Sequence, residues 1–302
     1  MRVLVLYSLV PEVREAGRMG IEFDMGPGVE GVLEALPGAV AVGVGGALGE
    51  VVGAVEKHSP EVVFNLCEAP YGRPDREHHV AAVLEWMGVP FTGSGSETLA
   101  LCRRKRRVKA VLAARGIAVP REGGFPCVVK PEGEDGSYGI HCDSLCYSEE
   151  DVVRAKRHFT GEAIVEEFLP GREFAVSLFG KTTPEYGAAG ETLFLEGMKL
   201  FTYGAKWAVG TPEFMNTPMR YAMDEDGELQ RTVMAAARGA WEVVEARGYL
   251  RVDVRQDRDG VPRVLDVNPN PALAPGDGAG LAAEEMGWTF GELIRRLVEW
   301  AC

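Results

Sequence analysis

Apolar and polar residues alternate along two stretches near the C-terminal end of the chain, residues 250–256 and 261–268. A period of two residues predicts β-strands, and the four residues between the stretches, DRDG, have the composition of a tight turn. We therefore expect an antiparallel hairpin with one apolar and one polar face. On the apolar face we expect Leu250, Val252, Val254, Leu265 and Val267, and on the polar face Arg251, Asp253, Arg255, Asp266 and Asn268.

The register of this hairpin decides which polar side chains meet. A four-residue loop pairs Gln256 with Val261. Arg251 then lies opposite Asp266, and Asp253 lies one diagonal step from Asp266. Two carboxylates and an amide oxygen gathered before the sequence NPNP suit Mg²⁺, and an arginine beside them suits a developing oxyanion. The alternative interpretation is the ordinary solvated side of a half-buried hairpin.

Residues 1–95 alternate short apolar strands with segments of helical period. This order predicts a parallel α/β unit. Because such sheets bind ligands at the carboxyl ends of their strands, the loops after Tyr7 and after Leu66 are candidate walls of a substrate site. Glu68 lies just after the second of these strands, and the alternative for it is a loop carboxylate in water.

The middle of the chain combines lysines with a glycine-rich loop. Lys105 and Lys109 are one helical turn apart in a pattern that ends at Gly116. The next strand ends at Lys130 and precedes a loop of glycine and other small residues. Glycines let backbone N–H groups approach anionic oxygens closely, and a lysine adds a point charge. We expect a flexible cover over phosphate groups, although the P-loop consensus is absent.

Two further segments carry candidate ligand groups. Glu166 and Glu167, followed by two apolar residues, are arranged to frame an adenine ring, and the alternative is a charged edge strand. Residues 200–218 show no sustained period and contain Lys206 between aromatic residues. Long loops without periodicity are usually functional lids or disordered segments, and we expect a closing lid here.

Two helices are expected toward the C-terminal end. Residues 224–248 form the longer helix, which ends at Gly248 and packs beneath the hairpin. Its apolar stripe contains Leu229, Val233, Ala237, Trp241 and Val244. The last helix starts at Thr289, with Glu292 three residues later, which is the pattern of a capping box.

Composition is that of a globular protein. With 302 residues, 46% of them hydrophobic, the chain can bury a large core, divided into two or three subdomains. Acidic residues outnumber basic ones, 45 to 32, which argues against a nucleic-acid or anionic-membrane partner, despite a basic run at 103–109. The N-terminal strand is too short for a signal-peptide core and no apolar run approaches a membrane span, so we expect a cytoplasmic protein.

Cysteine and histidine spacing gives no metal or disulfide pattern. The six cysteines include no C-x-x-C pair, so we expect reduced thiols. His78 and His79 are adjacent in a helical pattern and therefore point apart, which disfavours joint ligation of a metal.

Seven segments, taken in order, resemble the motifs of one protein family. They are TGSGSETLALCRRKRRVK, FPCVVKP, the Gly/Ser loop, VEEFLPGREF, TYGAKW, RVDVRQDRDG and LDVNPNP. The set spans about residues 60–302 and resembles the ATP-grasp superfamily, most closely its D-alanine–D-alanine ligase-like branch. The resemblance implies an α/β (α+β) ATP-grasp fold with an N-terminal Rossmann-like pre-ATP-grasp domain and a nucleotide held between two antiparallel sheets. The implied domains are residues 1–95, 96–178 and 179–302, the last with the metal site.

The resemblance also implies roles for single residues in binding ATP. Phosphate binding is implied for Lys105, Lys130, Ser137 and Gly139. Contacts with adenine and ribose are implied for Glu166, Glu167, Leu169 and Glu173. Lys206 matches the lysine of the lid loop, which binds ATP and takes part in catalysis.

At the reaction centre the resemblance implies a metal site and a catalytic arginine. Asp253, Asp266 and Asn268 match the ligands of one or two Mg²⁺ ions, or Mn²⁺, with Asp266 standing where glutamate is usual. Arg251 matches the arginine that stabilises the acyl-transfer intermediate. Such enzymes move the γ-phosphate of ATP to a carboxylate, and an amine then attacks the acyl phosphate. The implied partners are thus small molecules, a carboxylate donor and an amine acceptor, and a homodimer remains open.

The chain departs from this branch at both ends of the substrate site. The N-terminal G-G-x-S-x-E motif is absent, and the H-G motif is replaced by a stretch that contains Glu68. At the acceptor end Ala272 is followed by Asp277 in a region where a hydroxyl is expected, and an aspartate repels a carboxylate at close range. We therefore expect an ADP-forming carboxylate–amine ligase whose substrates are amino acids or small peptides other than two D-alanines. The alternatives are a genuine D-alanine–D-alanine ligase, and a nucleotide-binding protein or phosphotransferase without ligase activity.

Overall fold

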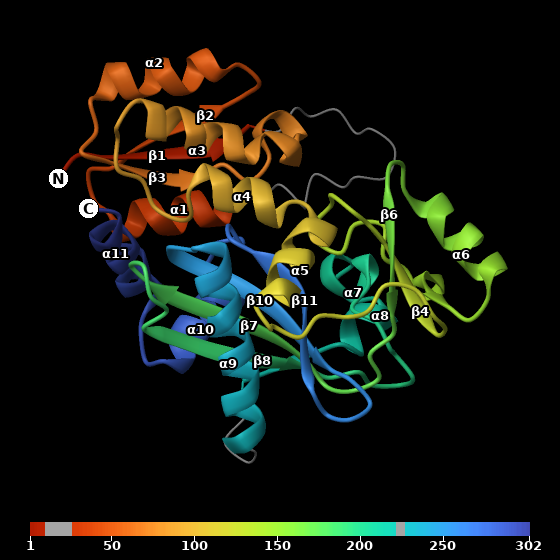
Figure 1. Ribbon diagram of the computed structural model, residues 1–302. Helices are drawn as coiled ribbons and strands as arrows, with labels where there is room; N and C mark the ends of the chain where they lie inside the picture. Colours follow the sequence, from red (N-terminus) through yellow and green to blue (C-terminus); the bar gives the residue numbers. More distant parts are fainter. Residues whose placement is uncertain (10–25, 222–226) are drawn as a thin grey trace.

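The N-terminal layer is a parallel sheet covered by helices (Figure 1). The computed structural model describes residues 1–9, 26–221 and 227–302. Its first sheet is parallel, as the alternating pattern predicted, and the order of its strands is β2-β1-β3. The elements are β1 Val3–Ser8, α1 Gly26–Ala35, β2 Val40–Val44, α2 Leu48–His58, β3 Val62–Leu66 and α3 Glu77–Trp86. Every residue of β3 is buried, because helices cover both faces of the sheet.

A small antiparallel sheet, order β5-β4-β6, lies away from the N-terminal layer (Figure 1). The elements of this part are α4 Ser96–Cys102, α5 Lys105–Ala114, β4 Cys127–Pro131, β5 Leu145–Cys146, α6 Glu149–Ala155 and β6 Ala163–Glu167. Short 3-10 helices, here and in the N-terminal layer, occupy Pro70–Gly72, Pro74–Arg76, Cys142–Ser144 and Lys156–His158. The face of the small sheet that α6 covers is apolar, and its buried side chains include Cys127, Val129 and Cys146.

The single helix expected before Gly116 is in fact two helices, α4 and α5. Glu132 explains where the second one begins. Its main-chain oxygen accepts from the N–H of Lys105 at 3.4 Å, and its carboxylate accepts from the N–H of Arg106 at 3.1 Å. These bonds satisfy N-terminal amides that have no partner within the helix. Lys105 is therefore the first residue of α5 rather than a mid-helix residue.

A five-stranded antiparallel sheet, order β11-β10-β7-β8-β9, forms the rest of the fold. Its elements are β7 Glu173–Gly180, β8 Tyr186–Thr192, α7 Tyr203–Trp207, α8 Pro212–Met215, β9 Met219–Arg220, α9 Gly227–Val244, β10 Gly248–Gln256, β11 Pro262–Asn268, α10 Gly278–Glu285 and α11 Phe290–Ala301. Segment 200–218 thus contains two short helices, and the predicted boundary at residue 178 falls within β7.

Helices cover both faces of the large sheet. The expected apolar stripe of α9 is buried against β7, β10 and β11, which confirms the packing predicted for this helix. Residues 224–226 of the expected helix lie outside the described residues. On the opposite face α10 and α11 join the core of the N-terminal sheet. The capping box of Thr289 and Glu292 at the start of α11 is present, as predicted.

The predicted register of the β10–β11 hairpin is wrong by one residue. Gln256 pairs with Pro262, so the loop contains five residues instead of four. The side chain of Asp257 causes the difference, because its Oδ1 accepts from the N–H groups of Asp259 and Val261, each at 2.9 Å. A turn closed by an aspartate in this way is a common device of loops.

A β-bulge then shifts the register once more, between Asp253 and Val254. Val264 and Val267 are both buried in the core beneath the sheet, and the two residues between them face the opposite side. Leu265, predicted on the apolar core face, is the extra residue, and Val264 takes its place in the core. The bulge thereby turns Leu265 and Asp266 to the same side of the hairpin, where both side chains line one cleft.

Two expectations from composition concern thiols and membranes. All six cysteines are free thiols, as predicted from their spacing. Within the described ranges, no helix is long and apolar enough to cross a membrane.

Candidate active site

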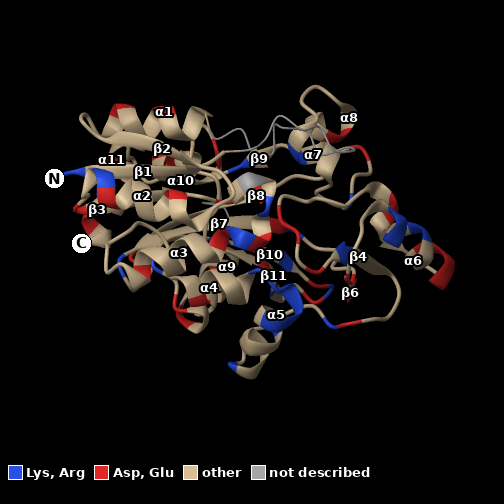
Figure 2. Ribbon diagram, turned by 90° about the horizontal axis from the view of Figure 1, so that it is seen from above, with Lys and Arg blue, Asp and Glu red and all other residues tan. Residues whose placement is uncertain are grey.

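A cleft lies between the small sheet and the large sheet. Its walls come from α5, β4, the loop that follows β4 (residues 132–141, here the glycine loop), the β6–β7 connection, α7 and the hairpin. Figure 2 shows the basic residues of α5 close to the mixed basic and acidic residues of β10 and β11. Of the predicted ligand residues, the walls include Lys105, Lys130, Ser137, Glu167, Leu169, Glu173, Lys206, Arg251, Asp253 and Asp266. Gly139, Glu166 and Asn268 do not line it.

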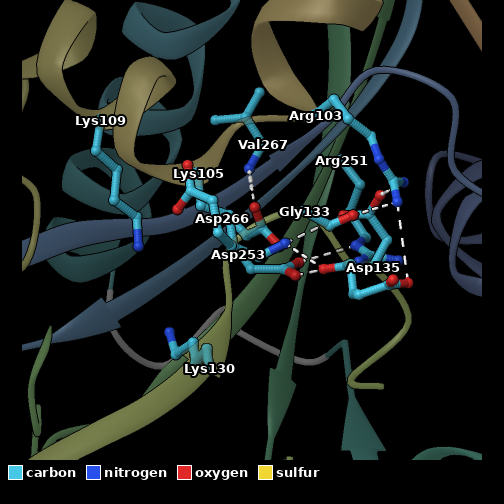
Figure 3. A network of polar contacts seen from close by, with 12 residues as sticks. Arg103, Lys105, Lys109, Lys130, Gly133, Asp135, Arg251, Asp253, Asp266 and Val267 are labelled. Carbon is cyan, nitrogen blue, oxygen red and sulfur yellow. Dashed lines mark hydrogen bonds and ion pairs between the residues drawn. The ribbon is translucent and has the colours of Figure 1, made fainter. Parts of the chain in front are cut away.

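The hairpin brings two carboxylates together. Asp253 and Asp266 are partners across β10 and β11. Arg251 binds Asp253 through two hydrogen bonds, Nε to Oδ1 at 2.9 Å and a terminal nitrogen to Oδ2 at 3.1 Å (Figure 3). Lys105 Nζ lies 3.4 Å from Asp266 Oδ2. Burial alone would lower the pKa of Lys105, but Asp266 and Asp135 outweigh it and raise that pKa.

The chemistry of these carboxylates fits a Mg²⁺ ion. Asn268, the third predicted ligand, lies opposite Arg251, and its Oδ1 accepts from the N–H of Asn270 at 3.0 Å. No cluster of three or more His, Cys, Asp or Glu side chains suited to a metal occurs among the described residues. A pair of carboxylates with at most one amide oxygen suits Mg²⁺, which keeps several waters and takes phosphate oxygens as ligands.

The glycine loop needs its glycines at two positions. Gly139 has φ of +72°, and a Cβ there would come within 2.9 Å of the Phe159 ring. Gly136 has φ of +67°, and its carbonyl accepts from Trp207 Nε1 at 2.9 Å. The N–H of Tyr203 also donates to the carbonyl of Ile140 at 2.8 Å. Helix α7 is thus docked on the loop.

This docking brings Lys206 of α7 to the cleft. Its Nζ lies 4.9 Å from the centre of the Trp207 ring. Burial and the charge of Arg251 lower the pKa of Lys206 to about 8, against the opposite effect of Asp253 and Glu68. A lysine with such a pKa changes charge near pH 8.

Glu166, for which a contact with adenine was expected, is not among the residues that line the cleft. It is 3% exposed, binds Lys109 Nζ, and lies 3.1 Å from Lys130 Nζ. Burial would raise the pKa of Glu166, but Lys130 and Lys109 lower it to about 2. Burial lowers the pKa of Lys109 to about 8, so Lys109 and Glu166 are both charged at neutral pH. Glu166 therefore fixes the position of Lys130, which does line the cleft.

The other end of the cleft is more apolar. Glu167 accepts from the Arg121 side chain at 2.6 Å. Glu173 accepts from Arg255 at 2.9 Å; burial raises the pKa of Glu173, and Arg255 opposes this. Apolar groups that line the same region include Val128, Phe168, Leu169, Phe174, Leu200 and Leu265. A flat, uncharged ring system fits between such walls.

The predicted substrate residues lie outside the walls of this cleft. Glu68 is half-buried, and burial together with Asp277 raises its pKa to about 7, against Lys206 and Arg251. Asp277 precedes α10, and burial raises its pKa, again against Lys206 and Arg251. The charges of Lys206 and Arg251, at one end of the cleft, therefore affect the pKa of both carboxylates. Ala272 is exposed.

Sequence patterns missed two residues of this site, Arg103 and Asp135. Asp135 lines the cleft and pairs with Arg103 at 2.7 Å and with Lys105 at 3.3 Å. The sequence shows that residue 103 is basic and residue 135 is acidic. It does not show that two residues about thirty positions apart form an ion pair.

A second missed contact ties the end of the hairpin to the N-terminal layer. Tyr249 donates to Asn270 Oδ1 at 2.5 Å, and Asn270 Nδ2 donates to Glu77 at 2.8 Å. Burial raises the pKa of Glu77 well above its ordinary value. The turn after β11 and the first residue of α3 are thereby held together.

Comparisons with known proteins agree with this architecture. A family model described as "D-ala D-ala ligase C-terminus" matches residues 102–299. A D-alanine–D-alanine ligase of Jannaschia sp. (strain CCS1) is 31% identical, over 99% of this chain and 95% of the relative. An "Uncharacterized protein y4sG" of Sinorhizobium fredii is 30% identical, over 79% and 74%. The solved D-alanine–D-alanine ligase of Bacillus anthracis, complexed with ATP, has a TM-score of 0.77 at 18% identity and covers 100% of this chain and 97% of its own.

The buried group around Glu166 gives a stability prediction. Replacing it by glutamine leaves Lys109 and Lys130 without their counter-charge, and we expect a loss of about 3–5 kcal/mol near neutral pH. Because the pKa of Glu166 is lowered from 4.5 to about 2, its contribution is complete above pH 4.5 and is lost as the pH falls toward 2. Urea unfolding of the parent and Glu166→Gln over this range should show the difference shrinking. The control is Glu167→Gln, whose partner Arg121 is exposed, and an equal loss in both variants would contradict the assignment.

Proposed function

The chain belongs to the D-alanine–D-alanine ligase family of ATP-grasp enzymes, and on that premise we propose that it is itself an ATP- and Mg²⁺-dependent D-alanine–D-alanine ligase that releases ADP and phosphate. One observation supports the ATP-dependent chemistry above all. Lys105 and Lys130 line the same cleft as the paired carboxylates of Asp253 and Asp266. The names of the relatives support D-alanine as the substrate. From the sequence we expected substrates other than two D-alanines, with a genuine D-alanine–D-alanine ligase as the alternative. We propose the alternative here, because the comparisons support it better.

In the proposed reaction the γ-phosphate of ATP moves to the carboxylate of one D-alanine. The amine of the second D-alanine attacks the acyl phosphate, an amide forms and phosphate leaves. Little covalent participation by the protein is needed, because the charge on the transferring group is stabilised by fixed positive groups. Lys105 and Lys130 supply that charge. Arg251, oriented by Asp253, stabilises the oxyanion that forms when the amine attacks.

The metal and the lid complete the proposed chemistry. Mg²⁺ would be held by Asp253, Asp266 and Asn268, and it supplies charge neutralisation at the phosphate oxygens. Water must be excluded, because it hydrolyses an acyl phosphate. We assign this role to the segment around α7, which contacts the glycine loop through Trp207 and adds Lys206 to the phosphate site.

Base and ribose are assigned to the apolar end of the cleft. There the backbone next to Leu169 and the carboxylate of Glu167 meet the adenine, with Leu265 as an apolar wall. Glu173 binds the ribose hydroxyls. Ser137 and Gly139 shape the glycine loop over the phosphates.

The substrate end supports one further candidate, an acceptor without a free carboxylate. Asp277 and Glu68 are two half-buried carboxylates near Arg251 and Lys206. Two carboxylates there attract an ammonium group and repel a carboxylate.

A panel of amines and amino acids, assayed for ADP and phosphate release, separates the two candidates. We expect D-alanine to be the best substrate of the parent enzyme. If the parent uses only acceptors without a carboxylate, and Asp277→Ser alone accepts amino acids, D-alanine ligation is refuted. Absence of Mg²⁺-dependent ATP binding would refute both candidates.

Two variants test the reaction centre. Lys130→Ala and Asp253→Asn should each lower kcat by on the order of 10²-fold or more, because each removes a fixed charge at the phosphates. Circular dichroism should show an intact fold. Lys57→Ala, an exposed lysine of α2, is the matched control and should keep full activity. Near-normal turnover of either site variant is the result that would count against the assignment.

The lowered pKa of Lys206 gives a pH prediction. The cation loses its proton near pH 8 instead of near its ordinary 10.5, so kcat/KM for ATP should fall as the pH rises through about 8. Lys206→Arg should move this fall to higher pH, because a guanidinium stays protonated. Lys109 also has a pKa of about 8, and a profile unchanged in Lys206→Arg would assign the fall to Lys109.

A further inference from the structure

The carboxylate of Asp135 is bound by two cations at the phosphate end of the cleft. Its Oδ2 lies 2.7 Å from Arg103, and its Oδ1 lies 3.3 Å from Lys105 Nζ (Figure 3). The side chain of Asp135 is 40% exposed, whereas those of Arg103 and Lys105 are only 10% and 6% exposed. The aspartate is therefore the member of this group that can leave toward solvent.

Both cations keep other partners when Asp135 leaves. Arg103 also donates to the carbonyl of Gly133. Lys105 donates to the carbonyl of Glu134 and lies 3.4 Å from Asp266. The fold does not require the Asp135 contact to satisfy buried charge, so a purely structural role explains it poorly.

The cations around Asp135 already have anionic partners, which points to an anion that is exchanged. Asp135, Asp253 and Asp266 lie within ion-pair distance of Arg103, Lys105 and Arg251. The carboxylate of Glu134 also lies 3.9 Å from Arg103. Burial would raise the pKa of Asp135, but Lys105 and Arg103 lower it, so the aspartate is ionised. A phosphate that joins this group adds negative charge beside Asp135, and the two anions compete for the same cations.

We propose that Asp135 is an internal anion that occupies Arg103 and Lys105 while no nucleotide is bound, and that a phosphate group of the nucleotide displaces it. Arg103 is then a further phosphate-binding residue of this chain. The inference rests on the proposed function, because it takes Lys105 as a phosphate ligand. An internal competitor lowers the apparent affinity for the nucleotide by the fraction of molecules in which the cations are free.

The test measures Kd by calorimetry for three ligands: the β,γ-imido analogue of ATP with Mg²⁺, inorganic triphosphate, and adenosine. In Asp135→Asn we expect the Kd of the two triphosphates to fall on the order of tenfold, because the competing charge is gone, and the Kd of adenosine to stay unchanged. In Arg103→Gln we expect weaker binding of both triphosphates. The matched control is Asp75→Asn, which breaks an Arg–Asp pair of 2.8 Å between exposed side chains and should change none of the three constants.

Several outcomes overturn the inference. Triphosphate binding that is unchanged or weaker in Asp135→Asn would refute it, and so would unfolding of that variant, because the contact would then be structural. Unchanged binding in Arg103→Gln would refute the role of Arg103. Suppose that the parent binds the ATP analogue and that Lys130→Ala does not. If Asp135→Asn then binds the analogue no more tightly than the parent, this inference fails and the proposed function stands. If the parent binds no nucleotide, the proposed function fails with it.

Discussion

Two aspartates that face each other across a hairpin need positive charge close by, and this requirement organises the centre of the molecule. Asp253 and Asp266 are partners on β10 and β11, where like charges repel. Arg251 neutralises the first and Lys105 the second. Because Lys105 is the first residue of α5, that helix has to begin at the edge of the hairpin, and Glu132 fixes its beginning by accepting the first free amides.

The same helix also binds the small sheet. One turn after Lys105, Lys109 contacts Glu166 of β6, which in turn holds Lys130 of β4. Helix α5 therefore links the two sheets through two ion pairs on one face, and the distance between the sheets at the cleft follows from its position. Buried ion pairs add little net stability, but a pair with one partner missing is costly. This asymmetry favours a single arrangement of the two sheets around the cleft.

Local patterns in the sequence determined the elements and the family. The hairpin, the parallel N-terminal sheet and the stripe of α9 follow from periods of two and of about 3.6 residues. The capping box of Thr289 and Glu292 follows from two residues within one turn. The ordered motifs from residue 60 onward gave the ATP-grasp resemblance, which the comparisons confirm. All of these signals lie within short stretches, and that is why they are present in the sequence alone.

Tertiary structure decided how these elements meet. The five-residue loop depends on hydrogen bonds of Asp257, and the bulge that turns Leu265 into the cleft depends on which valines the core beneath accepts. The division of α4 from α5 depends on Glu132, and the contact between Arg103 and Asp135 joins residues from separate segments. Periodicity records which face of an element is apolar. It does not record which distant charge an exposed or buried polar group will approach, because that is fixed only when the elements pack.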